Sequence, residues 1–73
     1  MILLNVCVNY WIDKNYTSDI YFKNVVRLHK NDKKKTFTVE QKNGKTYTFK
    51  DYLIESILIG VNPDYVEEGR RWI

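Results

Sequence analysis

The first twelve residues alternate between apolar and mixed side chains, and this period of two constrains the fold more than any other feature of the chain. Every second residue from Ile2 to Ile12 is apolar, and the residues between them include Asn5 and Asn9. Successive side chains of a β-strand point to opposite faces of a sheet, so a period of two separates two faces. We therefore predict a strand over residues 2–12 with one strongly apolar face.

A second strand is predicted over residues 20–30, after a polar loop over residues 13–19. Its apolar face consists of Ile20, Phe22, Val26 and Leu28. Asn24 interrupts this face. Pairing the two strands across the loop places Val6 opposite Val26 on the inner face. On the outer face, the same register predicts three pairs: Trp11 with Tyr21, Cys7 with Val25, and Leu3 with His29.

The clearest hairpin lies within residues 35–50, where two runs of Thr and aromatic residues flank Lys42-Asn43-Gly44. A two-residue Asn-Gly turn would set the apolar side chains of its two strands on opposite faces of the sheet. A three-residue loop with Gly44 in the left-handed conformation avoids this conflict. It predicts the pairs Gln41 with Lys45, Val39 with Tyr47, Thr38 with Thr48, and Phe37 with Phe49.

A four-residue turn over residues 31–34 is predicted to connect the second strand to this hairpin. It places Leu28 opposite Phe37 and Val26 opposite Val39, so the apolar side chains share one face. Four strands are thus expected to form an antiparallel meander with a single inner face.

The residues after the hairpin must help to cover that face, and two structures are compatible with them. In the first, Asp51 begins a single helical turn and residues 54–60 form a fifth strand, which curls the sheet toward a small barrel. In the second, residues 52–60 form a helix that packs across a four-stranded sheet, and the fold is α+β. The β-branched isoleucines of this segment favour the strand.

A short C-terminal helix is predicted next, because Asn62 and Pro63 are typical of a helix cap and a first helical position, and Gly69 of a helix end. The chain is expected to be one small, mainly β domain over residues 1–73. Four meandering strands, a one-turn connection and a fifth strand resemble, in their order, the SH3-like and Sm-like small barrels over residues 2–60. This resemblance implies a binding module without naming a ligand.

Enzyme signatures are absent from the sequence, which has no Gly-rich phosphate loop, nucleophile elbow or zinc-protease motif. Its one cysteine and one histidine, Cys7 and His29, cannot build a tetrahedral zinc site alone. We therefore predict a protein that is not an enzyme and uses no metal or cofactor. The N-terminal stretch has no basic leader and is too short to span a bilayer, so a cytoplasmic protein without membrane contact is expected.

The outer face of the first two strands is less polar than a solvated surface requires. Two large aromatic side chains, Trp11 and Tyr21, are interleaved with charged residues there, which is the composition of an interface centre. The predicted partner-binding residues are Leu3, Trp11, Tyr21, Lys23, Val25, Arg27 and His29. In the alternative interpretation, residues 61–73 fold back over this face.

Two functions from different classes fit these features. The first is a protein-binding module that forms a homodimer or binds another protein. In size and composition the chain resembles the accessory proteins of phages and prophages, among them inhibitors of host enzymes and defence systems. The second is a small-barrel protein that binds nucleic acid.

The nucleic-acid hypothesis rests on charge, since residues 30–50 contain seven lysines and only two acidic residues. The predicted phosphate contacts are Lys33, Lys34, Lys35, Lys42 and Lys45. Residues 51–73 contain five acidic residues and two arginines, and this acidic end would repel a polyanion. A protein partner is therefore the first expectation and nucleic acid the second.

Overall fold

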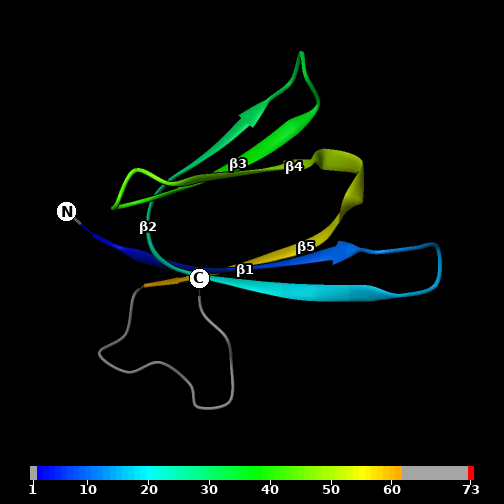
Figure 1. Cartoon of the computed structure of the whole chain (residues 1–73), viewed down its shortest axis with the longest axis horizontal. Coiled ribbons are helices and arrows are strands. Elements are labelled where there is room, and N and C mark those ends of the chain that lie inside the picture. Colours follow the sequence, from blue (N-terminus) through cyan, green and yellow to red (C-terminus); the bar gives the residue numbers. More distant parts are fainter. Residues whose placement is uncertain (1, 62–72) are drawn as a thin grey trace.

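The computed structural model describes residues 2–61 and residue 73, which form one five-stranded antiparallel sheet (Figure 1). The strands are β1 (Leu4–Trp11), β2 (Thr17–Asn31), β3 (Thr36–Gln41), β4 (Thr46–Lys50) and β5 (Ile54–Val61). A single 3-10 turn, η1 (Asp51–Leu53), connects β4 to β5. Across the sheet the order is β4-β3-β2-β1-β5, which confirms the predicted meander and its fifth strand.

The sheet folds over itself because β2 takes part in both of its halves. The first half of β2 pairs with β1, and the second half pairs with β3. Between the two halves β2 bends strongly, so β1 and β5 lie on one side of the molecule and β3 and β4 on the other (Figure 1). Apolar side chains from both sides then meet in the space between them.

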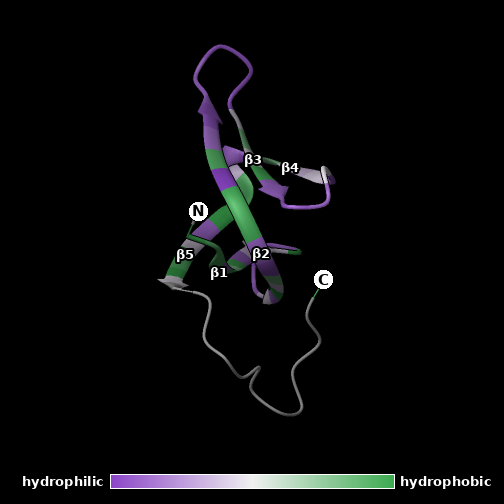
Figure 2. Ribbon diagram, turned by 90° about the vertical axis from the view of Figure 1, so that its left-hand side faces the viewer, coloured by the Kyte–Doolittle hydropathy of each residue, from purple (hydrophilic) through white to green (hydrophobic). Residues whose placement is uncertain are grey.

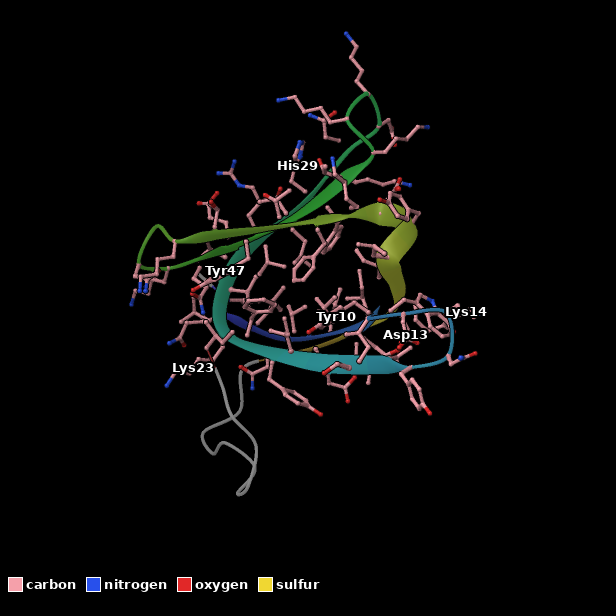
Figure 3. The ribbon with its side chains drawn as sticks, turned by 45° about the vertical axis from the view of Figure 1, so that its right-hand side comes forward. Tyr10, Asp13, Lys14, Lys23, His29 and Tyr47 are labelled. Carbon is pink, nitrogen blue, oxygen red and sulfur yellow. The ribbon has the colours of Figure 1, made fainter. Side chains whose placement is uncertain are left out.

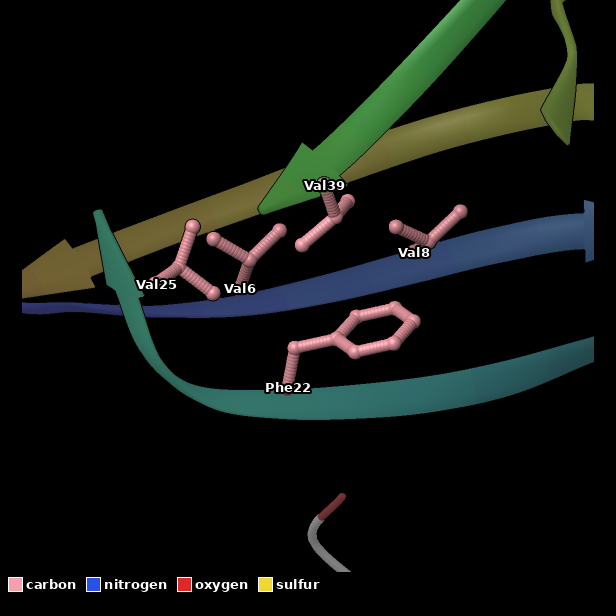
Figure 4. Close-up of a cluster of buried hydrophobic side chains, with 5 residues drawn as sticks. All are labelled: Val6, Val8, Phe22, Val25 and Val39. Carbon is pink, nitrogen blue, oxygen red and sulfur yellow. The ribbon is translucent and has the colours of Figure 1, made fainter. Parts of the chain in front are cut away.

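Five side chains in this space are completely buried: Val6, Val8, Phe22, Val25 and Val39 (Figure 4). Aromatic rings connect the two sides of the core. The ring centroid of Phe22 lies 4.9 Å from that of Tyr47 and 6.1 Å from that of Phe49. Full burial of a Val or Phe side chain contributes about 1.5–3 kcal/mol, so each member of this small cluster stabilises the fold by that order.

The bend in β2 begins at Asn24, whose backbone is left-handed with φ of 56°. The pairing registers shift on both sides of this bend, between Leu4 and Val6 of β1 and between Val25 and Arg27 of β2. A bulge of this kind reverses which side chains face inward. The predicted place of Val25 on the outer face is therefore wrong, because the bulge turns this side chain into the core. In Figure 2 this stretch is the most hydrophobic part of β2.

The predicted register between β1 and β2 is also wrong, because the loop that joins them is shorter than expected. Val6 pairs with Phe22 rather than with Val26. The loop closes at Asp13, whose carboxylate accepts hydrogen bonds from the backbone N–H groups of Asn15 (2.7 Å) and Tyr16 (3.0 Å). Short polar side chains commonly tighten turns in this way.

The connection between β2 and β3 is a four-residue turn as predicted, but it lies one residue further along the chain, over residues 32–35. Leu28 consequently pairs with Val39 and not with Phe37. The turn is held by Asn31, whose side-chain oxygen accepts the N–H of Lys34 at 3.0 Å. Leu28 keeps the face of the sheet that was predicted for it, so it still packs against the core.

The segment after β4 is a strand, and the alternative of a helix over residues 52–60 is wrong. Ile54 and Ile57 of β5 lie opposite Tyr10 and Val8 of β1 and pack against the core. The sheet curls but does not close into the predicted barrel, because β4 and β5 are its two edges and do not pair with each other. The predicted C-terminal helix over residues 62–69 lies outside the described residues.

None of the helical structure in the described ranges is both long enough and apolar enough to cross a membrane.

Candidate functional site

A hollow of about 440 Å³ opens where the end of β1 meets η1. It is lined by Trp11, Asp13, Lys14, Tyr52 and Leu53, and we call it the aromatic hollow. Figure 3 shows Asp13 and Lys14 at this end of the molecule. A second hollow lies at the opposite end, near Lys23 and Tyr47 (Figure 3).

One wall of the aromatic hollow is formed by Asp13 and Lys14 of the loop over residues 12–16, and hydrogen bonds fix the shape of this loop. The backbone N–H of Ile12 donates to the carbonyl oxygen of Tyr16 at 3.0 Å, while the Asp13 carboxylate holds the inside of the turn. Trp11 ends β1 opposite Thr17, directly beside this loop. A wall that is already ordered costs little conformational entropy when a ligand binds.

The other wall is η1, which presents two apolar side chains to solvent. Tyr52 is 73% exposed and Leu53 is 36% exposed. The turn is anchored at its start, where the N–H of Asp51 donates to the carbonyl oxygen of Lys35 at 2.9 Å. At its end, the N–H of Ile54 donates to the carbonyl oxygen of Asp51. The backbone of η1 is therefore held at both of its ends.

The structure does not bring the seven predicted partner-binding residues together on one face. Trp11 and Tyr21 are not a cross-strand pair, since Tyr21 lies opposite Cys7. Leu3 precedes β1 and does not meet His29, which is exposed opposite Thr38 of β3. Trp11 alone among them lines the aromatic hollow.

The remaining three predicted partner-binding residues lie in different surroundings. Lys23 lines the second hollow, and Val25 is buried in the core. Arg27 is exposed beside Glu40, with 3.8 Å between its Nε and the carboxylate Oε1. A role in binding stays a prediction for the exposed residues, but they do not form one continuous site.

Sequence reasoning missed Tyr52 and Leu53, because both were expected to cover the inner face of the sheet. A signal for their exposure does exist in the sequence. Asp51 predicts a single helical turn at this point, and the three residues of so short a turn cannot all face one side. Large apolar residues in a one-turn connection between two strands are thus candidates for a surface site.

The second hollow has a volume of about 420 Å³ and is rich in lysine. Its lining residues are Lys23, Asn24, Gln41, Lys42, Asn43, Lys45, Tyr47 and Ile73, and we call it the lysine hollow. The tip of the β3–β4 hairpin forms its rim. There the N–H of Gly44 donates to the carbonyl oxygen of Gln41, and the N–H of Gln41 to that of Lys45, both at 2.9 Å. These bonds, with φ of 88° at Gly44, confirm the predicted three-residue loop.

A buried amide forms the base of the lysine hollow. Gln41 is only 5% exposed, and its side-chain Nε2 donates to the main-chain oxygens of Lys23 (2.9 Å) and Ile73 (2.6 Å). The backbone of Ile73 also bonds the free edge of β2, since its N–H donates to the carbonyl oxygen of Tyr21 at 2.8 Å. Gln41 thus connects β3, the bend of β2 and residue 73 in one network.

The charge of the lysine hollow is positive, because it has three lysine side chains and no acidic side chain among its lining residues. The salt bridges within the described residues join Arg27 to Glu40 and Lys30 to Asp32, and neither involves this hollow. Of the five lysines predicted to contact phosphates, Lys42 and Lys45 lie here. The other three, at positions 33–35, lie in the β2–β3 turn at the far end of β3.

No three His, Cys, Asp or Glu side chains gather around a common point in residues 2–61 and 73. Comparison of the chain with models of protein families, with curated proteins and with solved structures finds no match.

Proposed function

We propose that this chain is a protein-binding module without enzymatic activity, and that it holds an extended segment of a partner protein in the aromatic hollow. The exposure of Tyr52 carries the proposal. A tyrosine of which 73% faces solvent, in a hollow that it shares with Trp11 and Leu53, leaves a large apolar area open to a ligand.

The chemistry of the hollow favours a peptide over a small polar substrate. Tyrosine and tryptophan are enriched at the centres of protein interfaces, because each buries a large area and loses few rotamers. Grooves lined by aromatic rings receive extended, proline-rich segments, whose backbone is already ordered before binding. Asp13 and Lys14 add one charge of each sign at the rim, where polar contacts select the partner.

An inhibitor encoded by a phage or prophage could use the same surface to block a host enzyme or defence protein. In that case the segment held in the aromatic hollow belongs to the target, and binding competes with the normal ligand of the target. An inhibitor and an adaptor need the same apolar anchor.

Selection from a library of random extended peptides on the immobilised full chain tests this proposal. Peptides that are enriched are then titrated against purified variants. We expect Tyr52→Ala to weaken binding about tenfold or more, as is usual when an interface anchor is removed. Trp11→Ala is expected to weaken binding as well, once circular dichroism shows that the variant is folded.

Tyr16→Ala is the matched control, because Tyr16 is 65% exposed but does not line the hollow. Its affinity for the selected peptides should equal that of the unmodified chain. Enrichment of no peptide, or equal affinity of the Tyr52→Ala variant and the unmodified chain, would show that the aromatic hollow is not the binding site.

Nucleic-acid binding is a second candidate function, supported by the lysine hollow. Three ammonium groups around one hollow, with no acidic lining residue, attract an anion such as a backbone phosphate. Tyr47 also lines this hollow and offers an aromatic surface to a base. The ring of Tyr47 packs against Phe22, however, so its contribution to stacking is smaller than that of a free ring.

A further inference from the structure

The outer edge of β5 is an apolar strand edge with no strand paired to it in the described part of the chain. Leu58 on one face of β5 is 70% exposed, and Ile59 on the other face is 56% exposed. Figure 2 shows hydrophobic residues along much of this strand. Unpaired apolar edges attract further strands, and natural proteins usually protect them with charges, prolines or bulges. On β5 the charge of Glu55 and the register shift between Ile54 and Ser56 lie at the start of the strand, and the stretch over residues 56–61 has no charge, proline or bulge.

We propose that β5 is the interface of a homodimer, in which the β5 strands of two copies pair antiparallel across a two-fold axis at Leu58. The two sheets then join into one continuous ten-stranded sheet. The inference goes beyond peptide binding in the aromatic hollow, because it uses a different surface and a different partner.

The side of each strand to which the backbone N–H and C=O groups point can be followed from β2 to the outer edge of β5. The carbonyl oxygen of Tyr21 and the N–H of Lys23 bond residue 73, so both point away from β1. Directions alternate along a strand, and Ile20 therefore points its N–H and C=O toward Val8 of β1, its partner in the register.

The same alternation continues through β1. Val8 points to β2, so Cys7 points to β5, where it lies opposite Leu58. The N–H and C=O of Leu58 therefore face β1. Those of its neighbours Ile57 and Ile59 face the open edge and are the groups that a new strand would bond.

These directions allow a symmetric register in which every pair is compatible. Placing Leu58 opposite Leu58 of the second copy makes Ile57 of each chain a hydrogen-bonded partner of Ile59 in the other. The two Leu58 side chains then meet in a pair without hydrogen bonds, where opposite side chains approach most closely. Ser56 of each chain lies opposite Gly60 of the other, so no bulky side chain collides there.

Charge does not oppose the pairing of two copies of this chain. Glu55 is the one charged residue of β5, and in this register it lies opposite Val61 of the other chain. The two Glu55 carboxylates are separated along the strands by six residues, roughly 20 Å, which is beyond the screening length of physiological salt. The edge is thus neutral at its centre and carries no repulsion against itself.

The oligomeric state of the full chain, measured by light scattering over a range of concentrations, is the first test. We expect the mass of two chains for the unmodified protein. Leu58→Lys should weaken the dimer about tenfold or more, because it replaces the central apolar pair by two like charges directly opposite each other. Ile12→Lys is the matched control, since Ile12 is 59% exposed and lies outside β5, and it should remain dimeric.

Disulfide trapping tests the register. Cys7 lies next to position 58, so the experiment uses a Cys7→Ala background. Leu58→Cys in this background should form a covalent dimer under mild oxidation, since Cα atoms of a pair without hydrogen bonds lie about 4.5 Å apart, within the range of a disulfide. Ser56→Cys should not, because the two cysteines would lie four residues apart along the strands.

Each other outcome contradicts the proposal in a distinct way. A monomer with rapid amide exchange at Ile57 and Ile59 means that the edge stays free. A monomer with slow exchange at both amides means that another part of the chain covers it. A dimer that survives Leu58→Lys, or one trapped by Ser56→Cys and not by Leu58→Cys, uses a different surface or register.

Discussion

The left-handed backbone of Asn24 and the complete burial of Val25, the next residue, are two parts of one feature. The bulge at Asn24 lets β2 pair with β1 before the bend and with β3 after it. Without this local reversal, Val25 would point out of the sheet and the two halves could not close over one core. The fold therefore depends on a conformation that most residues adopt only at a cost.

Asn24→Val is expected to destabilise the protein by about 1–2 kcal/mol, because a β-branched residue resists the left-handed region. Asn24→Gly should retain most of the stability, since glycine adopts positive φ freely. Urea unfolding followed by circular dichroism measures both values. If the two substitutions cost the same, the backbone of Asn24 is not the origin of the bend.

Alanine substitutions at two neighbouring valines test which side chain lies in the core. Val25 is fully buried and Val26 is only partly buried. Val25→Ala should cost about 2 kcal/mol, from the lost burial of two methyl groups and the cavity that remains, and Val26→Ala clearly less. The reverse order would support the unbulged register, in which Val26 faces the core.

The hairpin at residues 35–50 could be predicted from the sequence because two independent constraints agree there. The apolar residues lie on one face and the threonines on the other, and only a three-residue loop keeps the two sets on separate faces. The apolar set is Phe37, Val39, Tyr47 and Phe49. The Oγ1 atoms of Thr38 and Thr48 lie 3.1 Å apart on that second face.

The register of β1 and β2 could not be predicted in the same way. A shift by an even number of residues changes the pairs but leaves every side chain on its face, so the hydrophobic pattern does not select between such registers. The loop length depends on the hydrogen bonds of Asp13, and the bulge on a single backbone angle. Trp11 ends β1 beside Asp13 and Lys14, and the other residues that line the aromatic hollow come from η1.

Gly44→Val is expected to lower stability by about 1–2 kcal/mol through the backbone alone. A Cβ atom added at Gly44 would meet no other atom within 4 Å, so a collision of this atom does not contribute. Gly44→Asn should cost less, since asparagine tolerates positive φ better than valine does. Thermal unfolding compares the three proteins, and equal melting temperatures would contradict the observed loop conformation.

Gln41→Leu should destabilise the protein by about 1–3 kcal/mol, because the carbonyl oxygens of Lys23 and residue 73 lose a buried donor. Amide exchange at Lys23 and Ile73 is expected to accelerate, since these N–H groups belong to the same network. Gln41→Met separates size from hydrogen bonding, because it keeps the length of the side chain and removes the donors without adding a charge. If exchange at both amides is unchanged in both variants, Gln41 does not hold residue 73 against β2.

The lysine hollow predicts how nucleic-acid binding should depend on salt. For each tenfold rise in salt concentration, the affinity for single-stranded oligonucleotides falls by about 0.7 logarithmic units per phosphate that a lysine neutralises. Replacing Lys23, Lys42 and Lys45 together by alanine should thus flatten the slope of log affinity against log salt by about 2. The matched control replaces Lys33, Lys34 and Lys35, which removes the same charge from the β2–β3 turn and should leave most of the slope. Equal effects of both triple variants would show that only net charge matters, and no binding at low salt would rule out the nucleic-acid function altogether.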